Sequence, residues 1–267
     1  MTSSTMDASI LRPRTSAKNF EYERHPVPAG LADLVEHFWT VSWDLDGGRT
    51  YTAQTLPYPS VNLSVTNTEV DVTGLTRRCY HRHLRGAGYA VGARFRPGCF
   101  RPLIGGPVSD LTDRHRPVAE VLGRDTTELA RLVDERPDPS VRVGLLAEFL
   151  AGDWPDPDPT AEQVAGLVET IAGNRVITRV AQVAERGELT VRSLQRLFAE
   201  YVGAGPKWVI QRCRLQDAAA RVAAQDNLDW AELAAELGFA DQAHLTRAFT
   251  ATIGVPPATY ARQARTD

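Results

Sequence analysis

The chain has 267 residues, 43% hydrophobic and 24% charged, so it can bury a sizeable core as one large or two ordinary domains. Residues 1–20 hold no apolar run like that of a signal peptide, and no window approaches the roughly 20 apolar residues that cross a bilayer, so we expect neither export nor membrane insertion. The formal net charge of −3 does not suggest a nucleic-acid binder. From residue 174 onward, however, 12 Lys and Arg face 10 Asp and Glu, a balance that permits DNA binding without proving it.

The first half of the chain carries the signature of strands. We expect residues 1–19 to form a disordered arm and residues 20–152 to form a β-rich effector or dimerisation domain. Apolar and polar residues alternate near 37–43, 61–66 and 89–96, and Gly, Pro, Asn or Asp bound each run. This pattern predicts a barrel or sandwich, with a cupin-like barrel as one form, in an α+β protein of two domains.

The apolar period changes to about 3.6 after residue 121. Asp125 with Glu128 forms a capping box ahead of one short helix, and Ser140 precedes the apolar positions of a second, so two helices should trail the β-rich domain. Three prolines within 153–159 remove backbone donors and fix an extended chain, so we place a linker there. Thr160, with Gln163 three residues on, should cap the helix that opens an all-α domain over 160–267.

An internal repeat marks this last domain. Residues 180–185 match 230–235 at an offset of 50, and residues 194–198 match 245–249 at an offset of 51, so the second copy should have the longer turn. Each copy predicts a helix-turn-helix unit, whose second helix is capped by Thr190 or Asp241. A helix from Pro206 to about Gln225 would join the units. The first helices carry alanines that would let another helix approach closely, namely Ala181, Ala184, Ala231 and Ala234.

The outer face of each second helix is polar and rich in donors. Arg can bind guanine bidentately, Gln can pair with adenine, and Ser or Thr offers a hydroxyl. One solvent-facing helix alone would look similar, but two matched units at a fixed spacing near one DNA turn, about 34 Å, favour a DNA reader. The candidate residues are Arg192, Ser193, Gln195 and Arg196 in the first unit and Gln242, His244, Thr246 and Arg247 in the second.

Residues 165–263 resemble the AraC/XylS-type transcription regulators of bacteria. The likeness lies in LTVRSLQRLF at 189–198, GFADQAHLTRAF at 238–249 and GVPPATY at 254–260. It implies a seven-helix domain that inserts two recognition helices into successive major-groove segments of double-stranded DNA, a homodimer, and contact with RNA polymerase in an activator. It adds Ala243 to the contact residues. Because Ala243 departs from the polar residue often found there, the second helix should read bases more weakly or through DNA shape, and the first should supply more of the affinity.

The β-rich domain should sense a small molecule. Family members commonly carry a ligand or dimerisation domain ahead of the DNA-binding domain, and residues 91–98 resemble an uncharacterised version of it. Aromatic side chains with a few polar groups are typical of small-molecule sites, although strand aromatics usually form core and arginines usually face solvent. The candidate effector pocket comprises Trp39, Trp43, Tyr58, Asn62, Tyr80, Arg94 and Arg96.

Two alternatives involve cysteine. Cys79, His81 and His83 would share one strand face and could hold zinc or copper in a metal-responsive regulator, but the four arginines within 77–85 oppose a cation and favour a solvated basic hairpin. A DNA alkylation-repair protein would use a reactive Cys79 or Cys99, yet the three cysteines are far apart and lack the clustered zinc ligands of such proteins. The same spacing argues against disulfides and fits a reducing cytoplasm. We therefore expect a cytoplasmic regulator with no resident metal, no cofactor and no catalytic residues.

Overall fold

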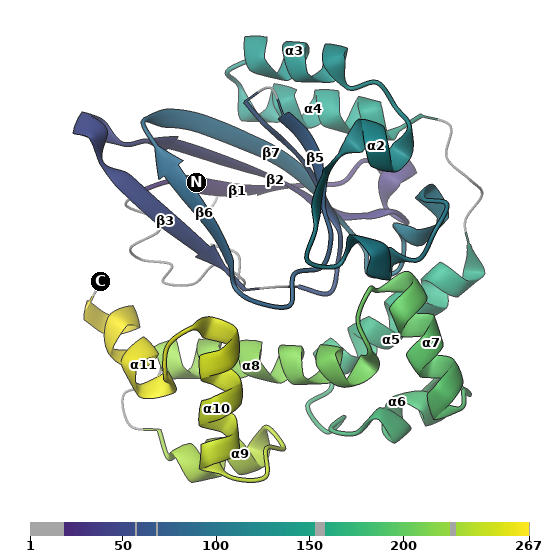
Figure 1. Cartoon of the computed structure of the whole chain (residues 1–267), viewed down its shortest axis with the longest axis vertical. Helices are drawn as coiled ribbons and strands as arrows, with labels where there is room; N and C mark the ends of the chain where they lie inside the picture. The colour runs from purple at the N-terminus through teal and green to yellow at the C-terminus, as the bar shows by residue number, and fades with distance from the viewer. Residues whose placement is uncertain (1–18, 57, 68, 153–157, 225–227, 267) are drawn as a thin grey trace.

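The computed structural model describes residues 19–56, 58–67, 69–152, 158–224 and 228–266. They form a β domain, which ends at residue 152, and a helical domain, which begins at residue 158; the β domain lies against the helical domain along one side (Figure 1). The predicted arm at 1–19 falls outside the described residues except for Asn19, and the predicted linker at 153–159 does so except for its last two residues.

The described part of the β domain contains eight strands in two sheets. Six strands form an antiparallel sheet in the order β1-β2-β7-β4-β5-β8, and β3 pairs with β6 in a second sheet (Figure 1). The predicted alternating runs correspond to β2, β4 and β7. The strands are β1 (Glu21–His25), β2 (Val35–Asp44), β3 (Thr50–Thr55), β4 (Asn62–Thr66), β5 (Glu69–Thr73), β6 (Tyr80–Arg85), β7 (Ala87–Phe95) and β8 (His115–Pro117).

Alternation along these strands gives the large sheet two faces. One face buries Phe38, Leu63 and Val91 in a core shared with α2 (Val118–Leu122), α3 (Thr127–Glu135) and α4 (Pro139–Leu150). The other face turns Trp39, Val41 and Trp43 toward β3 and β6. The expectation of a barrel or sandwich with trailing helices is confirmed.

The helical domain contains seven helices among the described residues, as the resemblance implied. One group, α5 to α7, and another, α9 to α11, lie at the two ends of the long helix α8 (Figure 1). The helices are α5 (Pro159–Gly173), α6 (Val180–Arg186), α7 (Val191–Tyr201), α8 (Pro206–Ala224), α9 (Trp230–Glu236), α10 (Gln242–Ile253) and α11 (Pro257–Thr266).

Three local predictions are wrong. The capping box of Asp125 and Glu128 does not form, since Thr126 stands at the N-cap of α3 and its side chain makes no capping hydrogen bond. Asp158, not Thr160, caps α5, and a proline takes the first helical position of α5, where no N–H is needed. Of the alanines expected at close helix crossings, Ala184 and Ala234 are buried, whereas Ala181 and Ala231, in the first turns of α6 and α9, are exposed.

The two domains meet along both ends of α8. Leu56 of the β domain is 2% exposed and packs into the core of α8 to α11, while the fully buried Leu75 packs into the core of α5 to α8. The Thr112 hydroxyl donates to the Gly203 carbonyl at 2.8 Å, and Arg101 pairs with Glu200 at 3.1 Å. Within the described ranges, no helix combines the length and apolarity needed to cross a membrane.

Candidate nucleic-acid interface and cavity

The repeat folds as two matched helix-turn-helix units. The first helices, α6 and α9, each have seven residues and are offset by 50. Past the turn, Leu189 N–H donates to the Ala184 carbonyl at 2.9 Å, and Phe239 N–H makes the equivalent bond to Ala234 at 2.8 Å. The extra residue of the second unit, Ala240, comes only after this bond and before α10 begins. The longer second turn is confirmed.

Both second helices start at the predicted caps. The Thr190 hydroxyl accepts the Ser193 N–H at 3.1 Å, and the Asp241 carboxylate accepts the His244 N–H at 2.6 Å. Each acceptor satisfies a backbone donor that the first helical turn leaves without a partner. The caps therefore set where α7 and α10 begin and which of their residues face outward.

The inner faces of α7 and α10 bury the predicted apolar residues. Leu194 and Phe198 are buried under α7, and Leu245 and Phe249 under α10. On the opposite side, each helix presents exposed residues from its first two turns, which we call its outer face. The outer faces consist of Arg192, Gln195 and Arg196 on α7 and Gln242, Ala243 and Arg247 on α10.

The other three candidates are half-buried. Ser193 accepts a hydrogen bond from the Thr190 hydroxyl at 2.9 Å, and Thr246 lies part-way down the side of α10. His244 packs edge-on against Phe239, with ring centroids 5.3 Å apart, and its Nδ1 accepts the Ala240 N–H at 3.4 Å. His244 thus closes the longer turn of the second unit, a role that the helical pattern alone did not reveal.

The β domain leaves the outer face of α7 open. Its contacts with α7 are at the far end of that helix, where Arg101 pairs with Glu200 and Thr112 bonds to Gly203. The Tyr201 hydroxyl also donates to the Asp158 cap of α5 at 2.7 Å. The C-terminal end of α7 is therefore held in place while its N-terminal outer face remains exposed.

A cavity of about 200 Å³ lies between the two sheets of the β domain. All of the predicted pocket residues except Arg96 line it, from β2, β4, β6, β7 and the segment after β3. Sequence reasoning did not select the other lining residues: Phe20, Tyr22, Val41, Ala53, Thr55, Leu56, Ser60, Ser64, Thr66, Thr73, Gly74, Thr76, Arg82, Leu84, Ala90 and His115.

Two glycines on β7 hold the tryptophans of the cavity wall in place. Trp39 lies opposite Gly92 and Trp43 opposite Gly88 in the β2–β7 ladder. A Cβ atom at either glycine would fall 2.3 Å from the facing indole ring, so only glycine lets the ring lie against the neighbouring strand. Trp39 Nε1 also donates to the Asn62 side chain at 3.4 Å. The indole rings thus form a fixed apolar surface.

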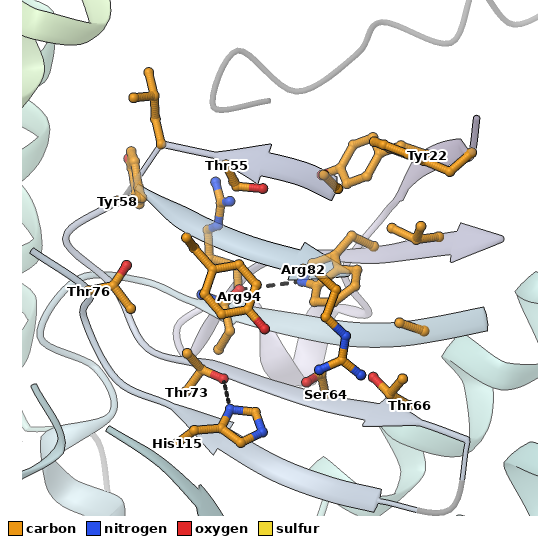
Figure 2. A pocket seen from close by; sticks show the side chains of 18 of the residues that line it. Tyr22, Thr55, Tyr58, Ser64, Thr66, Thr73, Thr76, Arg82, Arg94 and His115 are labelled. Carbon is orange, nitrogen blue, oxygen red and sulfur yellow. Dashed lines mark hydrogen bonds between the residues drawn. The ribbon is translucent and has the colours of Figure 1, made fainter. Parts of the chain in front are cut away.

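Two arginines bring positive charge to the cavity. Arg94 is 7% exposed, and its guanidinium carbon lies 4.9 Å from the centre of the Tyr58 ring. Arg82 extends from β6 toward Ser64 and Thr66 on the facing sheet (Figure 2). Sequence reasoning assigned Arg82 to a solvated basic hairpin. The alternation of β6 was the available signal, because it puts Tyr80, Arg82 and Leu84 on the same side.

Arg96 does not line the cavity. Strand β7 ends at Phe95, so the alternation that would have put Arg96 beside Arg94 stops, and the chain turns at Gly98 with a φ of +87°. Arg96 instead pairs with Glu169 of α5 at 3.3 Å, across the domain interface. The prediction that Arg96 lines the pocket is therefore wrong.

The proposed metal ligands are not arranged around a common point. The Cys79 thiol donates to the Thr55 carbonyl at 3.5 Å and packs against the α8–α11 core, whereas His81 and His83 are exposed and His83 bonds to Thr52. Among the described residues, no group of three His, Cys, Asp or Glu side chains is placed to hold a metal ion. The structure therefore gives no support to the metal-responsive alternative.

Two segments of the chain match known family models. Residues 23–117 match a domain of unknown function, DUF6597, and residues 183–263 match a helix-turn-helix domain. No curated protein matches the chain.

Solved structures similar to this chain include those of AdpA, AraT and ToxT. The DNA-binding domain of AdpA in complex with a target DNA is 26% identical, covering 41% of this chain and 96% of that one, with a TM-score of 0.34. The C-terminal domain of AraT, a response regulator from Geobacillus stearothermophilus, is 21% identical over 39% of this chain and 88% of that one, with a TM-score of 0.35. ToxT from Vibrio cholerae, bound to an unsaturated fatty acid, is 13% identical over 86% of this chain and 96% of that one, with a TM-score of 0.39.

Proposed function

We propose that this chain is an AraC-type transcription regulator, in which α7 and α10 of the helix-turn-helix domain at 183–263 read two successive major-groove segments of one operator. We assign base-edge contacts first to Arg196 and Arg247, which occupy equivalent exposed positions at an offset of 51. Arg192, Gln195, Gln242 and Ala243 complete the contact surface. We place Ser193, His244 and Thr246 at the edge of this contact surface, because each is half-buried.

One observation carries this function. Two helices, each capped by a side chain that accepts the N–H three residues on, present an exposed polar face, and α8 joins them. A single exposed helix would be ordinary surface. Two equivalent faces on one rigid connection are what a protein needs to read a bipartite DNA site.

The cavity supplies the second half of the proposal. We assign it to a small-molecule effector that controls DNA binding, because it combines fixed aromatic walls with a few polar groups. The proteins that this chain resembles are transcription regulators rather than enzymes, and we assign it no catalytic step.

Mutation of the two equivalent arginines tests DNA reading. Genome-wide footprinting with the purified protein gives the operator, and gel shifts then compare wild type with Arg196→Ala and Arg247→Ala. Each change should cost about 1–3 kcal/mol on the operator and relax specificity at one base position, because a bidentate guanine contact is lost.

Arg136→Ala is the matched control, since Arg136 is an exposed arginine of the β domain. It should leave operator affinity unchanged. If both outer-face variants bound the operator like wild type, the assignment of α7 and α10 as recognition helices would be wrong.

The family resemblance extends the proposal to partners. A homodimer should sediment as such with and without operator DNA, and an activator should stimulate RNA polymerase in a purified transcription assay. A bacterial-type regulator of this kind acts in the cytoplasm, where the chromosome lies.

A further inference from the structure

We infer that the cavity of the β domain binds an organic acid: an anionic group attached to an apolar body. This inference rests on the effector role proposed above and names the chemical class of the effector. It is carried by the charges on the cavity wall, by their positions, and by the shape of the remaining surface.

The charge of the wall is one-sided. The residues of the described chain that line the cavity include Arg82, Arg94 and His115 but no Asp or Glu. His115 is already engaged, because its Nε2 lies 2.8 Å from Asp71 and its Nδ1 2.7 Å from the Thr73 hydroxyl. Arg82 and Arg94 therefore supply the positive charge of the described cavity wall. A low-dielectric space strengthens their attraction for an anion and their repulsion of a cation.

The two arginines come from opposite walls. Arg94 belongs to β7 of the large sheet and stands beside Tyr58, with Thr76 near the same end of the cavity (Figure 2). Arg82 reaches across from β6 toward Ser64 and Thr66 (Figure 2). A carboxylate beside either guanidinium group would meet planar donors, which suit its two oxygens, and nearby hydroxyl donors.

The rest of the wall fits an apolar body. Phe20, Trp39, Val41, Trp43 and Leu84 line the cavity and pack together in one apolar cluster. Gly88 and Gly92 keep both indole rings flat against the sheet, so this part of the cavity is preformed. Burial of an alkyl chain or a fused ring there would add affinity through the hydrophobic effect. The acid group would select the ligand and the body would add affinity.

A matched set of probes tests the class. Decanoate, 1-decanol and decyltrimethylammonium share an alkyl body and differ in charge, and calorimetry with the full chain in the absence of DNA measures each affinity. Decanoate should bind at least 10-fold more tightly than decanol, and the cation should not bind measurably. 2-Naphthoate and 2-naphthol repeat the comparison with a fused-ring body.

Charge-removing variants locate the acid group. Arg94→Met and Arg82→Met remove the guanidinium group but keep an unbranched apolar side chain. Each should therefore reduce the preference for acid over alcohol by about 10-fold, while decanol affinity persists. Arg85→Met, on the same strand as Arg82 but exposed, should keep the full preference. If the buried Arg94 proves necessary for folding, the half-buried Arg82 still gives the test.

The inference is overturned if the alcohols bind as tightly as the acids, if neither acid binds, or if a folded Arg82→Met chain keeps the wild-type preference. Failure of the proposed function looks different. A chain that prefers acids but whose operator affinity does not respond to them would refute effector control and leave the ligand class intact. Loss of the acid preference would leave operator reading by α7 and α10 untouched.

Discussion

Burial sets the chemistry of two of the three cysteines. Desolvation raises the pKa of the Cys99 thiol to about 11, although nearby Arg96 works in the opposite direction. Desolvation also raises the pKa of Cys213 to about 11, against the favourable charge of Arg212. A nucleophilic methyl acceptor needs a thiolate, whereas a pKa of 11 leaves about one thiol in a thousand ionised at pH 8. Cys99 therefore does not suit the alkylation-repair alternative.

Alkylation kinetics test this state of the thiols. At pH 8 iodoacetamide should label Cys99 and Cys213 at least 100-fold more slowly in the native chain than in urea, because both access and ionisation are lost. The native rate should rise about 10-fold per pH unit up to pH 10, since the thiolate fraction grows until the pH reaches the pKa. Peptide mapping by mass spectrometry gives the rate at each cysteine. Labelling of native Cys99 as fast as in urea would contradict the burial argument.

Single residues also show where prediction from sequence stops. The combination of aromatic and polar residues on alternating strands was enough to select Trp39, Trp43 and Arg94, because strand alternation fixes which side chains share a face. The end of β7 removed Arg96 from that face, and strand ends depend on long-range pairing that no local pattern contains. Arg82 was missed because a basic strand looks like solvated surface until a second sheet covers it.

The turns of the two units differ in how well their residues suit the backbone. Glu188 adopts a φ of +53°, and Gly238, at the equivalent offset of 50, adopts +69°. Non-glycine residues pay about 1 kcal/mol or more in this left-handed region, because Cβ crowds the backbone. A Cβ at Gly238 would in addition lie 2.9 Å from the Thr178 methyl group. The first turn is therefore strained where the second is relaxed.

Glycine added to the first turn and glycine removed from the second should change the free energy of unfolding in opposite directions. Glu188→Gly should raise the free energy of unfolding by about 0.5–1 kcal/mol, and Gly238→Ala should lower it by at least 1 kcal/mol. Urea titration followed by circular dichroism measures both. Glu185→Gly is the control, because Glu185 is exposed but lies within α6, where glycine should destabilise by about 1 kcal/mol. A stabilising Glu185→Gly, or a destabilising Glu188→Gly, would contradict the assignment of strain to the turn.

The repeat made the helical domain the most predictable part of the molecule. Two copies give each element twice, so the caps at Thr190 and Asp241 and the longer second turn followed from comparing the chain with itself. The strands β1, β3, β5, β6 and β8 had no such second copy, and each is only three to six residues long. How the β domain docks on α8 depends on Leu56 and Leu75, which lie in connecting segments without any periodic pattern.

At the scale of the whole molecule, the β domain touches both helix-turn-helix units at once. Leu56 is buried with α8 to α11, and Leu75 is buried with α5 to α8. Both leucines adjoin the cavity, since Leu56 lines it and Gly74 and Thr76 line it on either side of Leu75. Thr112 and Arg101 add polar contacts near the first unit. The relative placement of α7 and α10 therefore depends on this docking as well as on α8.

Loosening the docking at Leu75 should broaden the spacing of DNA segments that the protein accepts. Leu75→Ala removes a fully buried side chain at the domain interface, a change that typically costs about 2–5 kcal/mol. Gel shifts would compare the operator with a derivative that carries two extra base pairs between the two segments, which rotate one segment by roughly 70° about the DNA axis. Wild type should bind the derivative far more weakly than the operator, and Leu75→Ala should narrow that ratio by 10-fold or more. Leu63→Ala, equally buried but in the core between the large sheet and its helices, should retain the wild-type ratio. If Leu75→Ala discriminated spacing as sharply as Leu63→Ala, α8 alone would set the geometry of the two recognition helices and the β domain would have no part in it.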